Sequence, residues 1–300
     1  MKPDREKGVL YAVAAYLIWG LFPIYWKQLA AVPALQLIGH RIVWSCVLLV
    51  VVLLVTRQFR SFLGSLTMKT GRVYFAAAVL ISINWFVYVW AITHDLVVEA
   101  SLGYFINPLL SVLLGVLLFR ERLRPFQWLP IALALGGVAY LTISLGSPPW
   151  VALVLAVTFG LYGAVKKTAP LNALFGLTAE TGILLVPAVL FLVLMEANGT
   201  GMFLHRPATE SILMVGGGVI TAIPLLLFAG ATVRVPLTTI GLLQYLTPTM
   251  QFLIGALMYH EPLPTTKLIG FGLVWIALLV FWGDNWRTRN RGHSLGVVAD

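Results

Sequence analysis

Charged residues are scarce in this chain of 300 residues. Asp, Glu, Lys and Arg together make up 10% of the sequence, whereas hydrophobic types make up 60%. Soluble globular proteins carry about 25% charged residues, because polar side chains must cover their surface. The composition therefore excludes an ordinary soluble enzyme, a nucleic-acid-binding protein and a disordered protein, and it indicates a polytopic membrane protein.

Cysteine is nearly absent, and the common catalytic motifs are missing. Cys46 is the only cysteine, so no intramolecular disulfide can form. The sequence contains no P-loop, HExxH motif, nucleophile elbow or CxxC pair. We therefore expect no cofactor, no metal site and no ATP-driven pump within this chain.

Long apolar runs, separated by charges, Pro or Gly, predict ten membrane-spanning helices. A span needs roughly 20 apolar residues. A single continuous segment can satisfy all its backbone hydrogen-bonding groups in lipid only as a helix. The predicted spans are 8–26, 35–55, 73–92, 97–119, 126–145, 149–165, 172–195, 211–231, 236–259 and 267–283. The run nearest the N-terminus lacks a clear signal-peptide cleavage site, so we interpret it as an uncleaved span.

The basic residues predict the orientation of these spans. If the N-terminus lies in the cytoplasm, sixteen of the 20 Lys and Arg fall on the cytoplasmic side, three on the other, and Arg41 within a span. Cytoplasmic loops are enriched in Lys and Arg. The sequence thus predicts a multi-pass protein with both termini in the cytoplasm.

An internal repeat is the most informative pattern. A shift of 140 residues aligns Pro108 with Pro248, Glu121 with Glu261 and Lys27 with Lys167 without a gap. A repeat of five spans must enter the membrane from the opposite side in its second copy, a construction typical of secondary transporters. We therefore predict an all-α fold with two inverted five-helix repeats, 1–145 and 146–286, and a basic cytoplasmic tail, 287–300.

Several strings resemble a known family. They are His40–Arg41, Asn84–Trp85, the run EASLGYFINP over residues 99–108, Gln244–Tyr245 and Thr247–Pro248. Together they resemble the RarD group of EamA-type permeases in the drug/metabolite transporter superfamily, over nearly the whole chain. The resemblance implies a bacterial inner-membrane protein of ten helices, named for an association with chloramphenicol sensitivity. It supplies no substrate, although relatives in the superfamily are linked to amino-acid and metabolite export and to S-adenosylmethionine uptake.

Ionisable groups inside spans are costly and mark candidate sites. Arg41 either snorkels to the outer interface or clamps an anion such as a substrate carboxylate. Glu99 is a candidate partner for Arg41, in a pair that is either structural or a gate. His40 and Glu180, which the 140-residue shift aligns, are candidates for proton coupling, although each also fits a hydrogen-bonded structural role.

Polar and aromatic residues in other spans complete the candidate binding site. Pro108 and Pro248 predict kinks in two repeat-related helices, which either line a cavity or serve packing alone. Trp26 and Trp90 fit interface belts, whereas Trp19 lies deeper. The full set of candidate substrate-binding residues is Trp19, His40, Arg41, Asn84, Trp85, Glu99, Tyr104, Asn107, Gln244, Tyr245 and Thr247.

The sequence therefore predicts a secondary transporter rather than an enzyme. It would move a small organic metabolite or drug-like solute, amino-acid-like or chloramphenicol-related, across the inner membrane by alternating access. The alternatives are a membrane-embedded enzyme acting on a lipid-like substrate and a passive channel. Expected partners are the solute and the bilayer but no nucleic acid, with protons as a coupling ion and a homodimer both left open.

Overall fold

The computed structural model describes residues 2–94, 97–123, 125, 128–145 and 150–259, together with 265, 268–269, 272, 275–276 and 279–280. The described part consists of helices and their connections, without a strand. The predicted tenth span, 267–283, lies largely outside the described residues, and the predicted tail, 287–300, lies wholly outside them.

Twelve α-helices follow one another along the described chain. They are α1 (Lys2–Gly20), α2 (Phe22–Lys27), α3 (Ala34–Val55), α4 (Phe59–Ser65), α5 (Met68–Thr93), α6 (Val97–Phe119), α7 (Trp128–Leu145), α8 (Trp150–Thr168), α9 (Ala173–Ala197), α10 (Ala208–Thr232), α11 (Leu237–Gln244) and α12 (Leu246–Leu253), and a π-helix, Ile254–Met258, continues α12. Each of the first nine predicted spans coincides with one helix or with consecutive helices.

The helices have the length and composition of membrane spans. Among the described residues, seven segments are long and apolar enough to cross a bilayer. They are Asp4–Lys27, Ala34–Val55, Met68–Ala91, Trp150–Thr168, Ala173–Ala197, Ala208–Thr232 and Leu237–Met258. Large apolar side chains such as Leu117, Ile143 and Val186 remain exposed on the bundle, where they would contact lipid. The prediction of an all-helical, polytopic membrane protein is confirmed.

Two of the spans are interrupted where the sequence predicts continuous helices. The first bends at Leu21, between α1 and α2, and Pro23 occupies the first turn of α2. The ninth is interrupted at Tyr245, between α11 and α12. Pro248 has no N–H to donate to the carbonyl of Gln244, so the backbone hydrogen-bond ladder cannot continue there. By contrast, α6 runs through Pro108 without interruption.

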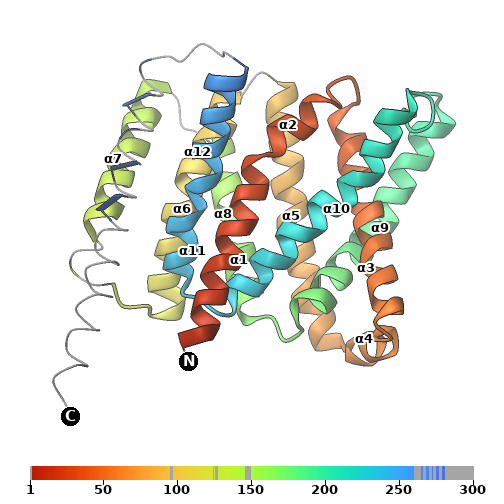
Figure 1. Cartoon of the computed structure of the whole chain (residues 1–300), viewed down its shortest axis with the longest axis horizontal. Helices are drawn as coiled ribbons and strands as arrows, with labels where there is room; N and C mark the ends of the chain where they lie inside the picture. Colours follow the sequence, from red (N-terminus) through yellow and green to blue (C-terminus); the bar gives the residue numbers. More distant parts are fainter. Residues whose placement is uncertain are drawn as a thin grey trace.

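The helices run alternately between the two ends of the bundle (Figure 1). One end, here called the N-terminal end, brings together the start of α1 and the ends of α8 and α10. Lys167 donates to the carbonyl of Val235 at 2.9 Å there, and a Cβ atom on Gly8 would lie 2.6 Å from that of Arg234. The opposite end, called the far end, carries α2 and the loop between α9 and α10. The helices therefore stand side by side as spans do.

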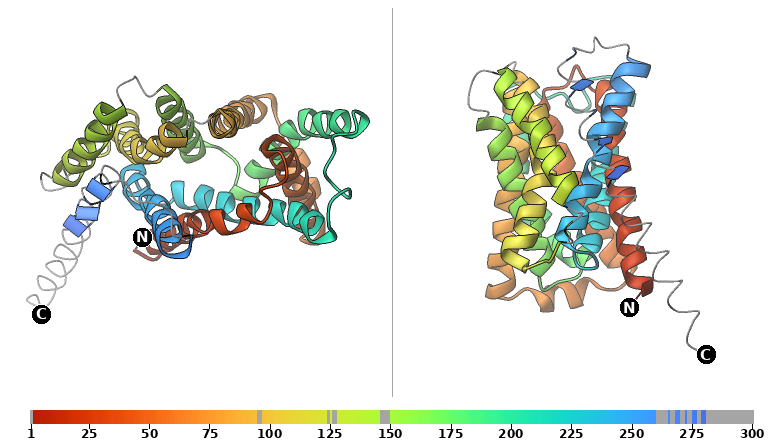
Figure 2. Two further views of the ribbon diagram at one scale, coloured as in Figure 1. Left: turned by 90° about the horizontal axis from the view of Figure 1, so that it is seen from above. Right: turned by 90° about the vertical axis from the view of Figure 1, so that its left-hand side faces the viewer.

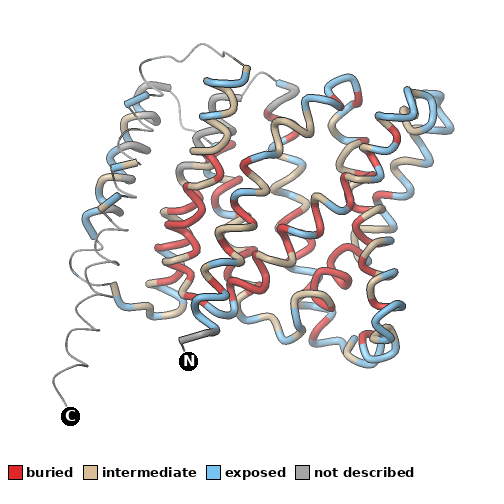
Figure 3. Tube along the Cα trace, in the orientation of Figure 1, coloured by how far each residue is buried: buried red, intermediate tan, exposed pale blue. Residues whose placement is uncertain are grey.

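The centre of the bundle is built from pairs of helices in contact. α1 packs against α10, α5 against α8, α3 against α9 and α10, and α6 against α8 and α11. α7 contacts α6 at the edge of the bundle, as the views in Figures 1 and 2 show. Buried residues concentrate where the central helices meet (Figure 3). These contacts bring polar side chains from distant parts of the chain together.

Candidate functional site

Arg41 lies on α3 within a cluster of aromatic side chains. Its Nε donates a hydrogen bond to Oγ1 of Thr221 on α10 at 2.9 Å. The guanidinium carbon lies 4.6 Å from the ring centroid of Trp85, 5.1 Å from that of Trp26 and 5.9 Å from that of Phe22. Cation–π attraction acts over these distances and strengthens when the cation is withdrawn from water. Four helices, α2, α3, α5 and α10, thus converge on one cation, which we call the Arg41 cluster.

Small residues on α10 allow α3 to approach closely enough to form this cluster. A Cβ atom on Gly217 would lie 3.4 Å from Cγ of Arg41. A Cβ on Gly218 would lie 2.4 Å from the backbone carbon of Trp44, which leaves no room for a larger residue. Ser45 uses the same approach to donate to the carbonyl of Gly218 at 3.0 Å. These two glycines therefore permit the close helix contact that sets the position of Arg41.

Tyr104 belongs to the surroundings of Arg41. Its ring meets that of Tyr88 edge-on, with centroids 6.1 Å apart. Both hydroxyls lie within electrostatic reach of the guanidinium. Glu99 belongs to the start of α6, but its side chain lies outside the description, so its predicted pairing with Arg41 stays a prediction.

His40 and Asn84 face away from this cluster. The buried imidazole of His40 packs on Phe203, with ring centroids 4.9 Å apart, in the loop between α9 and α10. The amide nitrogen of Asn84 donates to the carbonyl of Leu155 at 2.8 Å and to Oγ1 of Thr158 at 3.0 Å, both on α8. Asn84 thus joins α5 to α8, and in the described part of the chain the side chains of His40 and Asn84 bond to or stack on groups other than the Arg41 guanidinium.

Polar groups without partners mark the contact between α6 and α11. In the described part of the chain, Oδ1 of Asn107 and Oε1 of Gln244 are buried without a hydrogen-bond partner. Tyr245, which follows Gln244, is fully buried. Oγ1 of Thr247 donates to the backbone carbonyl of Tyr16 at 2.9 Å, which ties α12 to α1. A buried carbonyl oxygen without a partner is costly, so Asn107 and Gln244 are suited to accept a donor from a ligand or from water.

Trp19 lies in a second aromatic group, nearer the N-terminal end than Arg41. Its ring centroid lies 5.7 Å from those of Tyr16 and Phe228, and 6.0 Å from that of Phe159. Tyr162 stacks on Phe228 at 6.1 Å. We call these five rings the aromatic barrier, because they fill the space between α1, α8 and α10.

Glu180 forms a buried ion pair with Lys166. Nζ of Lys166 lies 2.6 Å from Oε1 of Glu180, and both side chains are 2% exposed. The hydroxyl of Tyr162 donates to Oε2 at 2.9 Å. The predicted span 149–165 ends just before Lys166, which counts among the sixteen basic residues of the cytoplasmic side, whereas the structure buries this lysine in the last turn of α8. Glu180 is therefore an ionic partner of Lys166 rather than an isolated carboxyl group.

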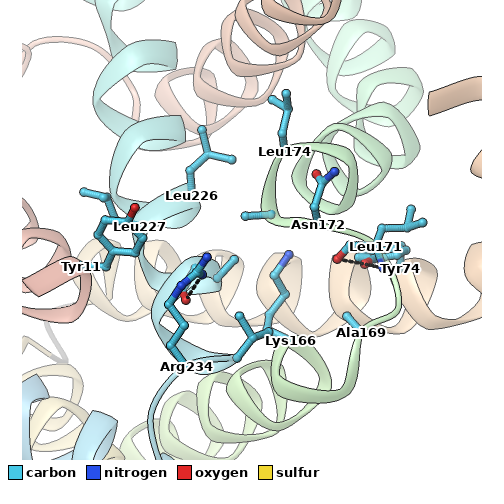
Figure 4. A pocket seen from close by; sticks show the side chains of 14 residues that line it. Tyr11, Tyr74, Lys166, Ala169, Leu171, Asn172, Leu174, Leu226, Leu227 and Arg234 are labelled. Atoms are coloured by element: carbon cyan, nitrogen blue, oxygen red, sulfur yellow. Dashed lines mark hydrogen bonds between the residues drawn. The ribbon is translucent and has the colours of Figure 1, made fainter. Parts of the chain in front are cut away.

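A cavity of about 500 Å³ opens beside this ion pair, at the N-terminal end of the bundle (Figure 4). Its polar lining comes from α1, α5, α8, the N-cap residue of α9 and the connection that follows α10. The side chains concerned are Tyr11, Tyr74, Lys166, Asn172 and Arg234. Nothing in the sequence singled out this group, because its members lie far apart along the chain. In the described residues, no three His, Cys, Asp or Glu side chains gather as they would around a metal ion.

Comparisons with known proteins agree with this architecture. The pattern of the EamA-like transporter family matches residues 6–143. The chain is 42% identical to Protein RarD of Streptomyces exfoliatus over 299 residues, which cover 98% of this chain and 94% of that protein. It is 43% identical to the uncharacterized transporter YojE of Bacillus subtilis, over 97% of this chain and 99% of that protein. The chain belongs to the RarD group of the EamA-like transporter family.

A solved structure supports the fold of this family member. A crystal structure matches with a TM-score of 0.69 and 21% sequence identity, covering 91% of this chain and 96% of that one. At this identity the likeness concerns the fold alone. The RarD-type chain is thus a multi-pass membrane transporter of small solutes, as the sequence predicts.

Proposed function

We propose that this protein is a secondary transporter that moves a small organic solute across the bacterial inner membrane by alternating access. The solute is a metabolite or drug-like molecule, and amino-acid-like or chloramphenicol-related compounds are the first to test. The observation that carries the proposal is the Arg41 cluster. A cation held by α3, α5 and α10 meets aromatic faces, and no ion pair joins it to a carboxylate among the described side chains.

The Arg41 cluster has the chemistry of a site for an organic acid or a polar aromatic solute. A guanidinium binds carboxylates with two parallel N–H donors, and among the described residues the Arg41 guanidinium donates only through Nε, to Thr221. Trp85, Trp26 and Phe22 offer faces for the apolar part of the solute. Tyr104 and Glu99 are the further candidates on α6, whereas Asn84 would act from α5 only after release from α8.

The packing of the helices supports an inverted repeat with units 1–145 and 146–286. The 140-residue shift relates α1 to α8, α3 to α9, α5 to α10, and α6 to α11 and α12. The same shift relates contacts between helices. The contact of α1 with α10 corresponds to that of α8 with α5, the contact of α3 with α10 to that of α9 with α5, and the contact of α6 with α8 to that of α12 with α1. All six pairs are in contact. α1 starts at the N-terminal end, where α8 stops, so the two copies run in opposite directions. Two such halves can expose one site to either side by rocking.

The layers along the bundle support a path for the solute. The Arg41 cluster lies toward the far end, and the cavity of about 500 Å³ opens at the N-terminal end. The aromatic barrier lies between them, and the Lys166–Glu180 pair borders the cavity. We propose that the N-terminal end faces the cytoplasm, because Lys and Arg concentrate there.

Proton coupling through Glu180 is a separate part of the proposal. Glu180 faces Lys166 and Tyr162, and the ring of Tyr74 lies 5.5 Å from the same Lys166 ammonium. Protonation of Glu180 would cancel the ion pair and free the lysine. His40, its repeat-related residue, packs on Phe203 at the far end and is the second candidate. Flux in proteoliposomes that does not respond to an imposed pH gradient would remove this part.

The test is transport by the purified protein in proteoliposomes. Wild-type protein should show saturable uptake of a candidate organic acid. Arg41→Gln should raise KM at least about tenfold, since a hydrogen bond to a charged group is worth about 1.5–3 kcal/mol. The matched control is Arg206→Gln, which removes an arginine near the same end that is engaged with Glu210. Equal loss in both variants would contradict the assignment of Arg41, and flux that never saturates would favour a channel.

A further inference from the structure

We propose that the cavity at the N-terminal end is a binding site for a small organic anion, held between Arg234 and Lys166. The inference rests on the proposed transport function, because it makes this cavity the first docking point of the solute at that end. The proposed ligand carries an acidic group on an apolar body. Glu180 then becomes the internal competitor that the anion displaces from Lys166.

The cavity has the size and lining of a small-molecule site. Ligand sites usually enclose about 300–1,000 Å³ and combine apolar walls with a few polar groups. This cavity encloses about 500 Å³, and its apolar wall includes Leu226 and Leu227 of α10 and Leu174 of α9. Figure 4 shows the ends of Lys166 and Arg234 directed toward the same space. Both cations can therefore reach one ligand.

Arg234 brings a charge that the described residues do not balance. Nη1 donates to the carbonyl of Gly230 at 2.7 Å, and the guanidinium carbon lies 5.5 Å from the ring centroid of Tyr11. These contacts fix the direction of the planar group. No carboxylate forms an ion pair with it in the described part of the chain. An oriented guanidinium at the wall of a cavity is suited to bind a carboxylate or phosphate group.

Lys166 of α8 supplies the second cation at the wall of the cavity. An ammonium group has three N–H donors, and Glu180 accepts one of them at 2.6 Å. The ring of Tyr74, which also lines the cavity, lies 5.5 Å from Nζ. The lysine is therefore in contact both with the buried carboxylate and with the space where a ligand would lie. An anion that enters this space can take over the ammonium from Glu180.

Tyr74 is held in place by the backbone of the segment before α9, which keeps this wall of the cavity fixed. Its hydroxyl accepts from the N–H of Leu171 at 3.0 Å and donates to the carbonyl of the same residue at 3.3 Å. The ring packs where a Cβ on Gly176 would lie 2.7 Å from it. This preorganisation reduces the entropy that a bound ligand would cost.

Binding of defined probes to the full-length protein tests the proposal. Phenylacetate combines a carboxylate with an apolar ring, and phenylacetamide is its uncharged match. In neutral detergent micelles, phenylacetate should raise the unfolding temperature of the wild type and phenylacetamide should not. Arg234→Gln should weaken phenylacetate binding at least about tenfold, since a hydrogen bond to a charged group contributes about 1.5–3 kcal/mol. Arg72→Gln, which removes an exposed arginine at the same end, is the matched control and should bind as the wild type does.

Glu180→Gln gives a result of opposite sign. It removes the competing carboxylate but keeps one carbonyl oxygen as an acceptor at the same place, so anion binding should become several-fold tighter. Equal binding by Arg234→Gln and the wild type would overturn the proposal. So would the absence of any response of the wild type to phenylacetate and inorganic phosphate.

Varying the lipid composition distinguishes a dissolved anion from a lipid headgroup as the ligand. The wild type is compared in phosphatidylcholine nanodiscs with and without phosphatidylglycerol. Free phenylacetate that binds in both, with the same dependence on Arg234, identifies a dissolved solute. An effect of Arg234→Gln that occurs only with phosphatidylglycerol identifies a lipid headgroup at the same site.

The binding measurements do not depend on transport. If the cavity binds phenylacetate through Arg234 but proteoliposomes show no flux, the transport proposal fails and the site remains. If flux is saturable and depends on Arg41 while Arg234→Gln changes neither binding nor KM, the anion site fails and the transport proposal remains.

Discussion

Breaking the Lys166–Glu180 pair should reveal how much this ion pair contributes to stability. Both side chains are 2% exposed, and Nζ and Oε1 are 2.6 Å apart. Removing one partner of a buried pair leaves the other charge without compensation, at a cost of about 3–5 kcal/mol. We therefore expect Lys166→Met and Glu180→Met each to lower the free energy of unfolding by about that amount.

The double variant separates the cost of an unpaired buried charge from the cost of changing the two side chains. Lys166→Met with Glu180→Met removes both charges and leaves two apolar side chains of similar length. Replacing both members of a buried pair by apolar residues is often neutral or stabilising. The double variant should therefore be more stable than either single variant. Tyr162→Phe removes only the hydroxyl that donates to Oε2, so it should cost about 1 kcal/mol.

Equilibrium unfolding in mixed micelles, followed by circular dichroism, measures these differences. The matched control is the pair of Arg206 and Glu210, which lies at the surface with side chains 37% and 16% exposed. Its double-mutant cycle should give a coupling below about 1 kcal/mol. If each single variant at Lys166 or Glu180 costs less than 1 kcal/mol, or if the costs simply add, the pair is not the interaction that holds α8 to α9.

Three further variants test other contacts. Glu121→Gln should cost about 0.5–2 kcal/mol in thermal unfolding, because the carboxylate accepts from two backbone N–H groups at the start of α11, at 2.7 and 2.9 Å. Gly218→Ala should cost about 1–3 kcal/mol, since its Cβ would lie 2.4 Å from the backbone of Trp44, whereas Gly163→Ala meets its nearest atom at 3.4 Å and should be tolerated. Trp85→Leu should raise KM in proteoliposomes by about 2- to 30-fold through loss of a cation–π contact worth about 0.5–2 kcal/mol, with the unfolding temperature as the check on folding.

The spans could be predicted from the sequence because lipid imposes one simple requirement. A helix must cross an apolar layer, so an uninterrupted run such as 35–55 predicts α3 within one residue at its start. The interruptions at Leu21 and Tyr245 could not be predicted in the same way. An interrupted helix and a straight helix have the same apolar composition. The position of an interruption depends on which backbone carbonyls find other partners, such as the carbonyl of Tyr245, which accepts from Oγ1 of Thr249 at 2.8 Å.

The site was only partly accessible from the sequence. Arg41 and Trp85 were predicted, because an arginine in a span is rare and costly. Trp26 was assigned to an interface belt, although it faces Arg41 at 5.1 Å. Lys166 was assigned to a loop because it ends an apolar run. Its burial depends on the packing of α8 against neighbouring helices, which no local pattern encodes.

The proposed repeat relates the helices of the two units but not their charged residues, and this difference bears on the proposed mechanism. Under the 140-residue shift, Glu180 corresponds to His40 and Arg41 corresponds to Thr181. The N-terminal end is joined by the ion pair of Lys166 with Glu180. At the far end, Gln36 bonds to the backbone of Thr200 and Met202 at 2.8 and 3.0 Å. Under the proposed alternating access, opening the N-terminal end would break an ion pair, whereas opening the far end would break neutral hydrogen bonds. The proposed anion would compete with Glu180 for Lys166 at the N-terminal end, whereas the bonds of Gln36 at the far end hold no ionic pair for it to disrupt. A charged solute would therefore favour opening of the N-terminal end.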